Sequence, residues 1–328
     1  MKFELIPGSP VVFRKQKSDS PYKDTNEDKL KVLDILDTKF QEAIKVDNTT
    51  LGTKNLIYFA TYGNNYSTLL EQCLTSIYNY CKTINFDILI ITDENTSKII
   101  KSKEIIKKFN CNYFIVDTPE DGIAASMTKM LINKYYRINE YGKVLFLDTD
   151  IVFAKDVQEI FDIELGDKME VVEAFTLRDT GKTFYKDKIA NLYSLYSGLS
   201  FFTEKNEKFI EERDPNVFSA GHFLYRNTKQ MQAHFENVNW LISVWPGPYF
   251  FEQSFLNQYF IFNDLVTYGN LSSRVEFITF LQGPYYDEPT VKRHKDEHVF
   301  LHFAGQPING AGKLQYIQYY CKAHSICL

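Results

Sequence analysis

Two carboxylates at the end of an apolar segment have the chemistry of a metal site. An apolar run at residues 144–147 is followed by Asp148, Thr149 and Asp150. Side chains two residues apart on an extended backbone point to the same side, so the two carboxylates would lie together. Neighbouring carboxylates repel each other unless a cation lies between them, and their oxygens suit Mg²⁺ or Mn²⁺, which also bind phosphate. The motif therefore predicts a divalent-metal site; the alternative is an Asp pair that caps a turn.

Three later segments carry further candidate residues. Residues 218–227 are expected to form a strand with small residues in its middle, and such a break lets a ligand approach the backbone. Glu252 and Gln253 stand side by side at the start of a predicted helix. His302 and Gly305 follow an apolar strand. For a lone histidine in such a strand, the alternative is a core residue that is hydrogen-bonded to the backbone.

Alternating strands and helices must position these residues. Apolar strands are predicted at residues 56–60, 86–91, 112–116 and 144–147, with helical spacing between them. Repeated strand-helix units imply an α/β fold with a doubly wound, mostly parallel sheet, whose ligands bind at the carboxyl ends of the strands. The second half is less regular. It has predicted strands at 170–176, 217–225 and 299–303, predicted helices at 228–240 and 252–259, and a partly helical excursion at 178–216.

The first 50 residues are predicted to be an N-terminal extension with one amphipathic helix, and residues 51–328 a single domain. The helix is indicated by Leu30, Leu33, Leu36, Phe40 and Ile44, which recur at steps of three and four. Such a helix packs on the main domain or docks a partner.

Composition excludes several classes of protein. A net charge of −5 lacks the basic surplus that is typical of nucleic-acid-binding proteins. The sequence has no apolar run of about 18 residues and no signal-peptide pattern at its start, so we expect no transmembrane span and a cytoplasmic protein. The five cysteines are odd in number and lack zinc-ligand spacing, which favours free thiols. The sequence is compatible with a homo-oligomer.

The order of these motifs resembles that of retaining glycosyltransferases with the GT-A fold. It is similar to the glycogenin and lipopolysaccharide galactosyltransferase family, and to fungal and plant galactosyl/xylosyltransferases. The resemblance extends over residues 55–313 and rests on Asp-x-Asp, the small-residue strand, the acidic-Gln helix and His-Phe-x-Gly in that order. It implies transfer of a hexose or pentose from a UDP-sugar to a glycan, protein or lipid acceptor, with retention of configuration and with Mn²⁺ or Mg²⁺.

The resemblance also assigns roles to residues. Asp148, Asp150 and His302 would bind the metal. Tyr66 would stack on uracil and Lys129 would lie near the donor sugar and phosphates; the other expected donor-binding residues are Ala60, Thr61, Tyr62, Thr149 and Gly305. Glu252 and Gln253 would lie beneath the anomeric carbon, and Asp179 would contact the sugar. Asp93 follows the second strand, where its carboxylate could accept the uracil N–H.

Each of these residues also has a structural interpretation. Tyr66 would be a core position on its helix, Lys129 an exposed helix residue, and Glu252 an acid that the helix dipole favours. The sequence departs from the family at Ser219, where Asn is usual, and at Ile308, where the family often has a lysine that grips the diphosphate. Lys313, next to a Gly-rich loop at 309–312, is a candidate replacement.

Two other functions compete with glycosyl transfer. A haloacid-dehalogenase-type phosphatase also places Asp-x-Asp after an apolar strand, with Asp148 as nucleophile and Asp150 as acid/base. Its motif strand usually opens the domain, whereas here three strands precede it. The other rival is a catalytically dead, carbohydrate-binding protein, against which the intact Asp148, Asp150 and His302 argue.

Overall fold

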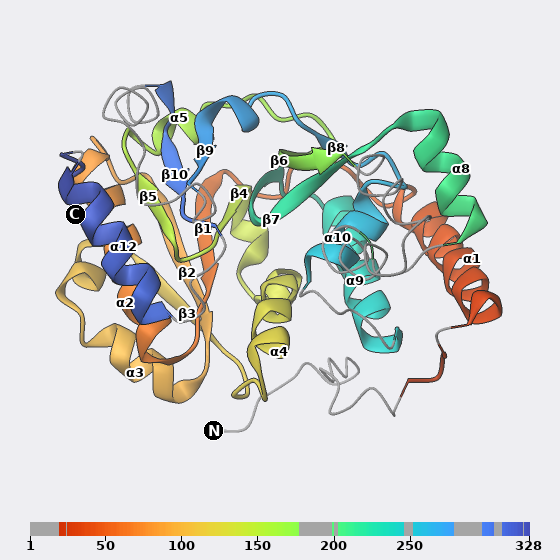
Figure 1. Ribbon diagram of the computed structural model, residues 1–328, viewed down its shortest axis with the longest axis horizontal. Coiled ribbons are helices and arrows are strands. Elements are labelled where there is room, and N and C mark those ends of the chain that lie inside the picture. The colour runs from red at the N-terminus through yellow and green to blue at the C-terminus, as the bar shows by residue number, and fades with distance from the viewer. Residues whose placement is uncertain are drawn as a thin grey trace. The chain divides into compact units, whose positions relative to one another are not determined.

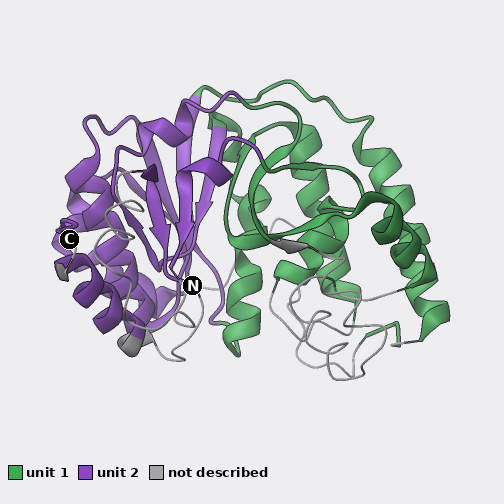
Figure 2. Ribbon diagram, turned by 45° about the horizontal axis from the view of Figure 1, so that its top comes forward, with its two compact units in different colours: residues 1–53, 119–142, 165–268 green, residues 54–118, 143–164, 269–328 purple. Residues whose placement is uncertain are grey.

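The computed structural model describes residues 20–23, 25–176, 199, 203–245, 252–278, 297–304, 310–323 and 325–328. The chain forms two compact units that are discontinuous in sequence (Figure 2). Unit 1 comprises residues 1–53, 119–142 and 165–268, and unit 2 comprises residues 54–118, 143–164 and 269–328. The interpretation of residues 51–328 as a single domain stays a prediction.

Unit 2 contains parallel strands separated by helices, as the sequence indicates (Figure 1). The strand order is β3-β2-β1-β4, and β2 runs parallel to both β1 and β3. The central residues of β1 and β2, Leu56–Phe59 and Ile88–Ile91, are apolar and buried, which is typical of strands covered on both faces. The elements are β1 (Lys54–Ala60), α2 (Gly63–Tyr80), β2 (Phe86–Thr92), α3 (Glu94–Lys101), η2 (Glu104–Lys108), β3 (Cys111–Ile115) and β4 (Tyr141–Leu147, the last five residues of which belong to unit 2).

A second sheet in unit 2 was not predicted from the sequence as a sheet. Its three strands lie in the order β5-β10-β9, with β5 at Ile151–Phe153, β9 at Val275–Phe277 and β10 at Phe300–His302. Strand β10 is antiparallel to β5 and parallel to β9. The remaining described elements of the unit are α5 (Gln158–Phe161), η5 (Ser272–Arg274) and α12 (Gly310–Ala323).

Helix α12 packs against this second sheet. Ile317, Tyr320 and Cys321 share a hydrophobic cluster with Val152 of β5 and Leu301 of β10. The helix also lies beside α2 (Figure 1). The core of unit 2 therefore joins three segments that are far apart in the sequence.

Unit 1 combines a strand pair with several helices. Strand β6 is antiparallel to β7 and parallel to β8. The elements are α1 (Asn26–Ala43), α4 (Gly122–Met127), η3 (Thr128–Lys134), η4 (Ile138–Glu140), β6 (Met169–Thr176), α8 (Glu204–Arg213), β7 (Asn216–Arg226), α9 (Lys229–Val244), α10 (Gln253–Phe260) and β8 (Val266–Thr267).

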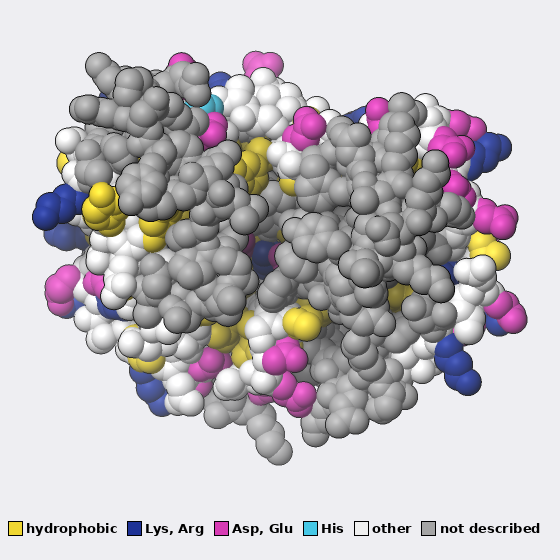
Figure 3. Space-filling view, viewed as in Figure 1, with side chains coloured by type: hydrophobic (Ala, Val, Ile, Leu, Met, Phe, Trp, Pro, Cys, Tyr) yellow, Lys and Arg dark blue, Asp and Glu magenta, His cyan; other side chains and the backbone are white. Residues whose placement is uncertain are grey.

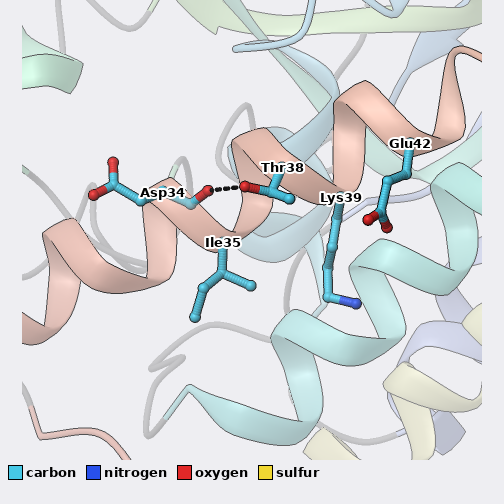
Figure 4. A pocket seen from close by; sticks show the side chains of 5 residues that line it. All are labelled: Asp34, Ile35, Thr38, Lys39 and Glu42. Atoms are coloured by element: carbon cyan, nitrogen blue, oxygen red, sulfur yellow. Dashed lines mark hydrogen bonds between the residues drawn. The ribbon is translucent and has the colours of Figure 1, made fainter.

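The N-terminal helix α1 packs on α9. Asn237 Nδ2 donates to Lys39 O at 3.1 Å, and Gln230 Nε2 donates to Ile44 O at 2.9 Å. The Lys39 ammonium lies 5.1 Å from the centre of the Trp240 ring. A surface hollow of about 380 Å³ on α1 is lined by Asp34, Ile35, Thr38, Lys39 and Glu42 (Figure 4). It contains none of the predicted site residues.

Two local expectations are wrong. The Lys- and Ile-rich segment after residues 86–91 predicts one helix that ends near Phe109. The helix α3 instead ends at Lys101 and is followed by a separate 3₁₀ segment, η2, because Ser102 N and Lys103 N donate to Ile99 O and Ile100 O. The Gly-rich segment before Lys313 is not wholly a loop, since α12 begins at Gly310.

The described surface is mixed in charge. On the face shown in Figure 3, acidic and basic side chains of the described residues are interspersed. Among the helices that the structure describes, none combines the length and apolarity needed to cross a membrane.

Gly52 lies where two backbone segments of unit 1 approach each other closely. A Cβ atom at this position would lie 2.1 Å from both the carbonyl carbon and the oxygen of Glu140, so the backbone would have to move. We expect Gly52→Ala to lower the free energy of unfolding by about 3 kcal/mol, at the upper end of overpacking costs. Urea denaturation measures this. Gly166→Ala, in the same unit, meets no atom within 4 Å and is the control; equal effects of the two substitutions would contradict the prediction.

Candidate functional site

Asp148, Asp150 and His302 lie together in unit 2. One potential ligand atom from each residue lies within 4.8 Å of the others. Asp150 and His302 are 8% and 4% exposed. Asp150 immediately precedes β5, and His302 of β10 is the register partner of Ile151. The antiparallel pairing of β5 with β10 therefore brings the histidine to the carboxylates, although 152 residues (302 − 150) separate His302 from Asp150.

Neighbouring groups fix the positions of Asp150 and His302. Phe303 N donates to Asp150 O at 3.0 Å, and the ring of Phe277 lies 5.2 Å from the His302 ring. Lys313 Nζ donates to Asp150 Oδ2 at 2.5 Å, and His302 Nε2 lies 3.4 Å from Asp150 Oδ1. Burial opposes ionisation of Asp150, but the charges of Lys313 and His302 outweigh it and hold the pKa of this carboxyl well below its usual range. Asp150 is therefore ionised at neutral pH.

The three residues fit a divalent cation. Asp150 Oδ1 is buried and accepts no hydrogen bond from the residues that the structure describes, so a carboxylate oxygen stands ready for a further partner. Two carboxylates and an imidazole are ligand types that Mn²⁺ accepts well and Mg²⁺ accepts less readily. Asp148, Asp150 and His302 are thus the residues that would hold such an ion.

A second polar cluster lies in unit 1 around Lys129 and Glu252. Lys129 Nζ donates to Glu252 Oε1 at 2.5 Å and to Ala220 O at 3.1 Å. The two residues are 3% and 5% exposed. Glu252 Oε2 is also buried and has no hydrogen-bond partner in the described part of the chain. Lys129 lies in η3, but it is not the exposed helix residue of the structural interpretation.

An irregularity in β7 makes this cluster possible. Between the pairs Val171–Phe223 and Glu173–Phe218, β6 advances by two residues (173 − 171) and β7 by five (223 − 218). The strand pair is therefore interrupted around Ala220, whose N–H donates to Gln253 Oε1 at 3.2 Å and whose oxygen accepts from Lys129. At the predicted small-residue break, the side chains of Gln253 and Lys129 therefore form hydrogen bonds with the β7 backbone.

Comparisons with known proteins identify the chain. The glycosyl transferase family 8 model matches residues 56–307. The chain belongs to glycosyl transferase family 8. It is a glycosyltransferase, and the resemblance drawn from the ordered motifs is confirmed.

The comparison with solved structures also found similar chains. The galactosyltransferase LgtC, in complex with donor and acceptor sugar analogues, matches with a TM-score of 0.52 and 15% identity over 82% of this chain and 95% of LgtC. An active-site mutant of LgtC matches with a TM-score of 0.49 and 16% identity, over 81% of this chain and 95% of the LgtC chain. The apo structure of the bifunctional glycosyltransferase WbbM matches with a TM-score of 0.47 and 16% identity, over 79% of this chain but only 47% of WbbM. A search of curated proteins found no match.

The LgtC match confirms the predicted α/β, GT-A-like fold with a mostly parallel sheet. Since β1, β2 and β3 are parallel and the Asp-x-Asp motif follows β4, the family 8 motif occupies the carboxyl end of a strand, as expected.

The expected nucleotide-binding residues of this family 8 member follow β1 and β2. Thr61 is buried, and its Oγ1 has no hydrogen-bond partner among the described residues. Tyr66 is 50% exposed and so is not a core position on α2. Asp93 caps α3: its carboxylate accepts from Thr96 N at 2.8 Å and from Thr96 Oγ1 at 3.0 Å. Gly63 N donates to the same hydroxyl, which ties the start of α2 to Asp93.

The other predicted residues are distributed as follows. Ala60 and Tyr62 are half-buried at the end of β1, and Thr149 is 6% exposed between the two aspartates. Asp179 and Gly305 lie outside the described residues. Asn257, from the acidic-Gln helix motif, is structural: its Oδ1 accepts from Phe218 N at 3.0 Å, and its Nδ2 donates to Phe218 O at 3.1 Å.

Sequence reasoning missed several contributors to the site. The Lys129–Glu252 pair joins two motifs that the sequence treats separately. Phe277, beside His302, belongs to the unpredicted β9. Leu314, Ile317 and Cys321 recur at helical spacing, a signal that could have revealed α12 and placed Lys313 on a helix.

Proposed function

We propose that this family 8 enzyme transfers a hexose or pentose from a UDP-sugar, with retention of configuration, to a hydroxyl of a glycan, protein or lipid. It requires a divalent cation, Mn²⁺ in preference to Mg²⁺. The observation that carries the proposal is the convergence of Asp148, Asp150 and His302, two carboxylates and an imidazole from distant segments. A haloacid-dehalogenase-type phosphatase or a purely structural protein gives no reason for the histidine beside the two aspartates.

Asp148, Asp150 and His302 hold the cation in this proposal. When bound, the cation neutralises the charge that develops on the diphosphate leaving group. Tyr66 offers an exposed ring for the base, and stacking on the ring tolerates any base. The preference for uridine therefore rests on the family resemblance, with Asp93 as a further acceptor for the imide N–H.

Lys129, Glu252 and Gln253 are assigned to the donor sugar, together with Asp179. Retention by a double displacement would need a protein nucleophile, and Glu252 is the candidate. Its carboxylate is buried and paired with Lys129, which supports a role in positioning neighbouring groups and not one as nucleophile. We therefore favour departure and attack on the same face of the sugar, with the leaving phosphate accepting the acceptor's proton.

A panel of UDP- and GDP-sugars tests this function. We expect slow hydrolysis of one UDP-sugar with Mn²⁺, less with Mg²⁺, and none in excess EDTA, because the leaving diphosphate then lacks its counter-charge. Full turnover in EDTA would exclude the proposed metal role. Tighter calorimetric binding of GDP than of UDP would contradict the base assignment. Once an acceptor is found, NMR of the product linkage decides between retention and inversion.

A further inference from the structure

Lys313 occupies an unusual position for a cation in a metal site. Its ammonium donates to Asp150 Oδ2, on one of the carboxylates assigned to the divalent ion. The side chains of Lys313 and Asp150 are only 15% and 11% exposed, so water screens this pair weakly. The position normally filled by the diphosphate-binding lysine of the family holds Ile308 instead.

The placement of Lys313 follows from the core packing of α12. Ile317 and Tyr320, four and seven residues further along the helix, share its face and are buried against β5 and β10. Asp150 immediately precedes β5, and His302 is the last residue of β10. The backbone of Lys313 is therefore fixed beside Asp150, while its four-carbon side chain can swing without moving the helix.

An ammonium and a divalent ion do not share Asp150 favourably. The ammonium offsets part of the repulsion between Asp148 and Asp150 when no metal is bound. A divalent cation on the same carboxylate repels the nearby ammonium, so metal binding displaces Lys313 from Asp150. The displaced ammonium stays tethered within a side chain's length of the metal cluster, where a diphosphate is the complementary charge.

We propose that Lys313 is a tethered cation that pairs with Asp150 in the metal-free site and moves to the donor diphosphate when the divalent ion binds. The inference rests on the proposed function and adds to it a competition between a side chain and the metal. It predicts opposite effects of one substitution on two ligands, whereas a purely structural lysine would affect both in the same direction or neither.

Calorimetry with Lys313→Met measures both effects. Without nucleotide, Mn²⁺ should bind about tenfold more tightly than to the unmodified protein, since the competing charge-assisted hydrogen bond is gone. With saturating Mn²⁺, UDP should bind about tenfold more weakly. Lys313→Arg keeps the charge and should stay near the unmodified protein in both titrations. Lys322→Met, exposed on the same helix, is the matched control and should change neither.

The outcomes separate this inference from the proposed function. If neither the unmodified protein nor Lys313→Met binds Mn²⁺, the metal-dependent function itself fails. If both bind Mn²⁺ with equal affinity, or if UDP affinity is unchanged in Lys313→Met, the inference is overturned and the function stands. Mn²⁺ binding that appears only after the lysine is removed supports the competition. Circular dichroism in the presence of Mn²⁺ verifies that each variant is folded.

Discussion

Asp150→Asn is expected to lower the rate of donor hydrolysis by about 10²–10³-fold, the loss that removal of one preorganised charge-stabilising group produces in other enzymes. The substitution keeps the shape of the side chain but removes a buried negative charge that accepts from Lys313 and faces His302. Mn²⁺ binding should weaken in parallel, because an amide oxygen is a poorer ligand for a divalent cation. Steady-state hydrolysis assays and calorimetry measure the two effects.

The control for this variant is Asp162→Asn. Asp162 lies in the same unit on the exposed surface, where it accepts a hydrogen bond from Gln158. It should leave both hydrolysis and Mn²⁺ affinity unchanged. A fall in rate without a change in metal affinity would show that Asp150 acts in some way other than as a ligand. Full activity of Asp150→Asn would exclude the assigned role altogether.

Lys129→Met is expected to lower the free energy of unfolding by about 3–5 kcal/mol, since it leaves the buried carboxylate of Glu252 without its counter-charge. The ammonium also satisfies Ala220 O in the interrupted part of β7, so that oxygen loses a hydrogen bond as well. Urea denaturation followed by fluorescence measures the change. Activity should fall too, because Glu252 and the β7 backbone lose the group that holds them.

A matched pair in the same unit serves as the control. Lys134 Nζ lies 2.5 Å from Glu236 Oε1, the same distance as in the Lys129–Glu252 pair, but the side chains are 23% and 45% exposed. Lys134→Met should therefore cost less than about 1 kcal/mol. The double variant Lys129→Met/Glu252→Leu removes both charges and should recover part of the stability lost in Lys129→Met. Equal costs for Lys129→Met and Lys134→Met would show that burial of the pair is not what stabilises it.

Local patterns sufficed for the regular parts of the fold. Strands β1 and β2 contain the apolar runs Leu56–Ala60 and Ile88–Ile91, and α9 begins with a Thr228 cap, so hydrophobic spacing and capping chemistry locate them. The short strand β5 was not predicted because three apolar residues are also compatible with a turn or a buried coil. Its strand character comes from pairing with β10, which the local sequence does not encode.

In the candidate site, too, features set by the local sequence were predictable, and features set by contacts between distant segments were not. The Asp148/Asp150 pair is visible from spacing alone, whereas His302 was assigned to the metal only through the family's motif order. The buried state of Lys129 was not predictable, since a lysine in a helical segment is normally exposed and only its distant partner Glu252 makes burial tolerable. The pairing of Lys313 with Asp150 was not predictable either, because it depends on how α12 packs and because 163 residues separate the two.

The pairing of β5 with β10 also has a consequence for sequence length. His302 lies beside the aspartates because it stands opposite Ile151, the residue that follows Asp150, in that register. Side chains alternate between the faces of a strand, so a slip of one residue would turn the imidazole away and present Leu301 or Phe303 instead. An insertion or deletion of a single residue within 150–153 or 299–302 would therefore abolish the ligand set, whereas exchange of one apolar residue for another there would preserve it. Functional relatives of this enzyme should vary in the composition of these two segments but not in their length.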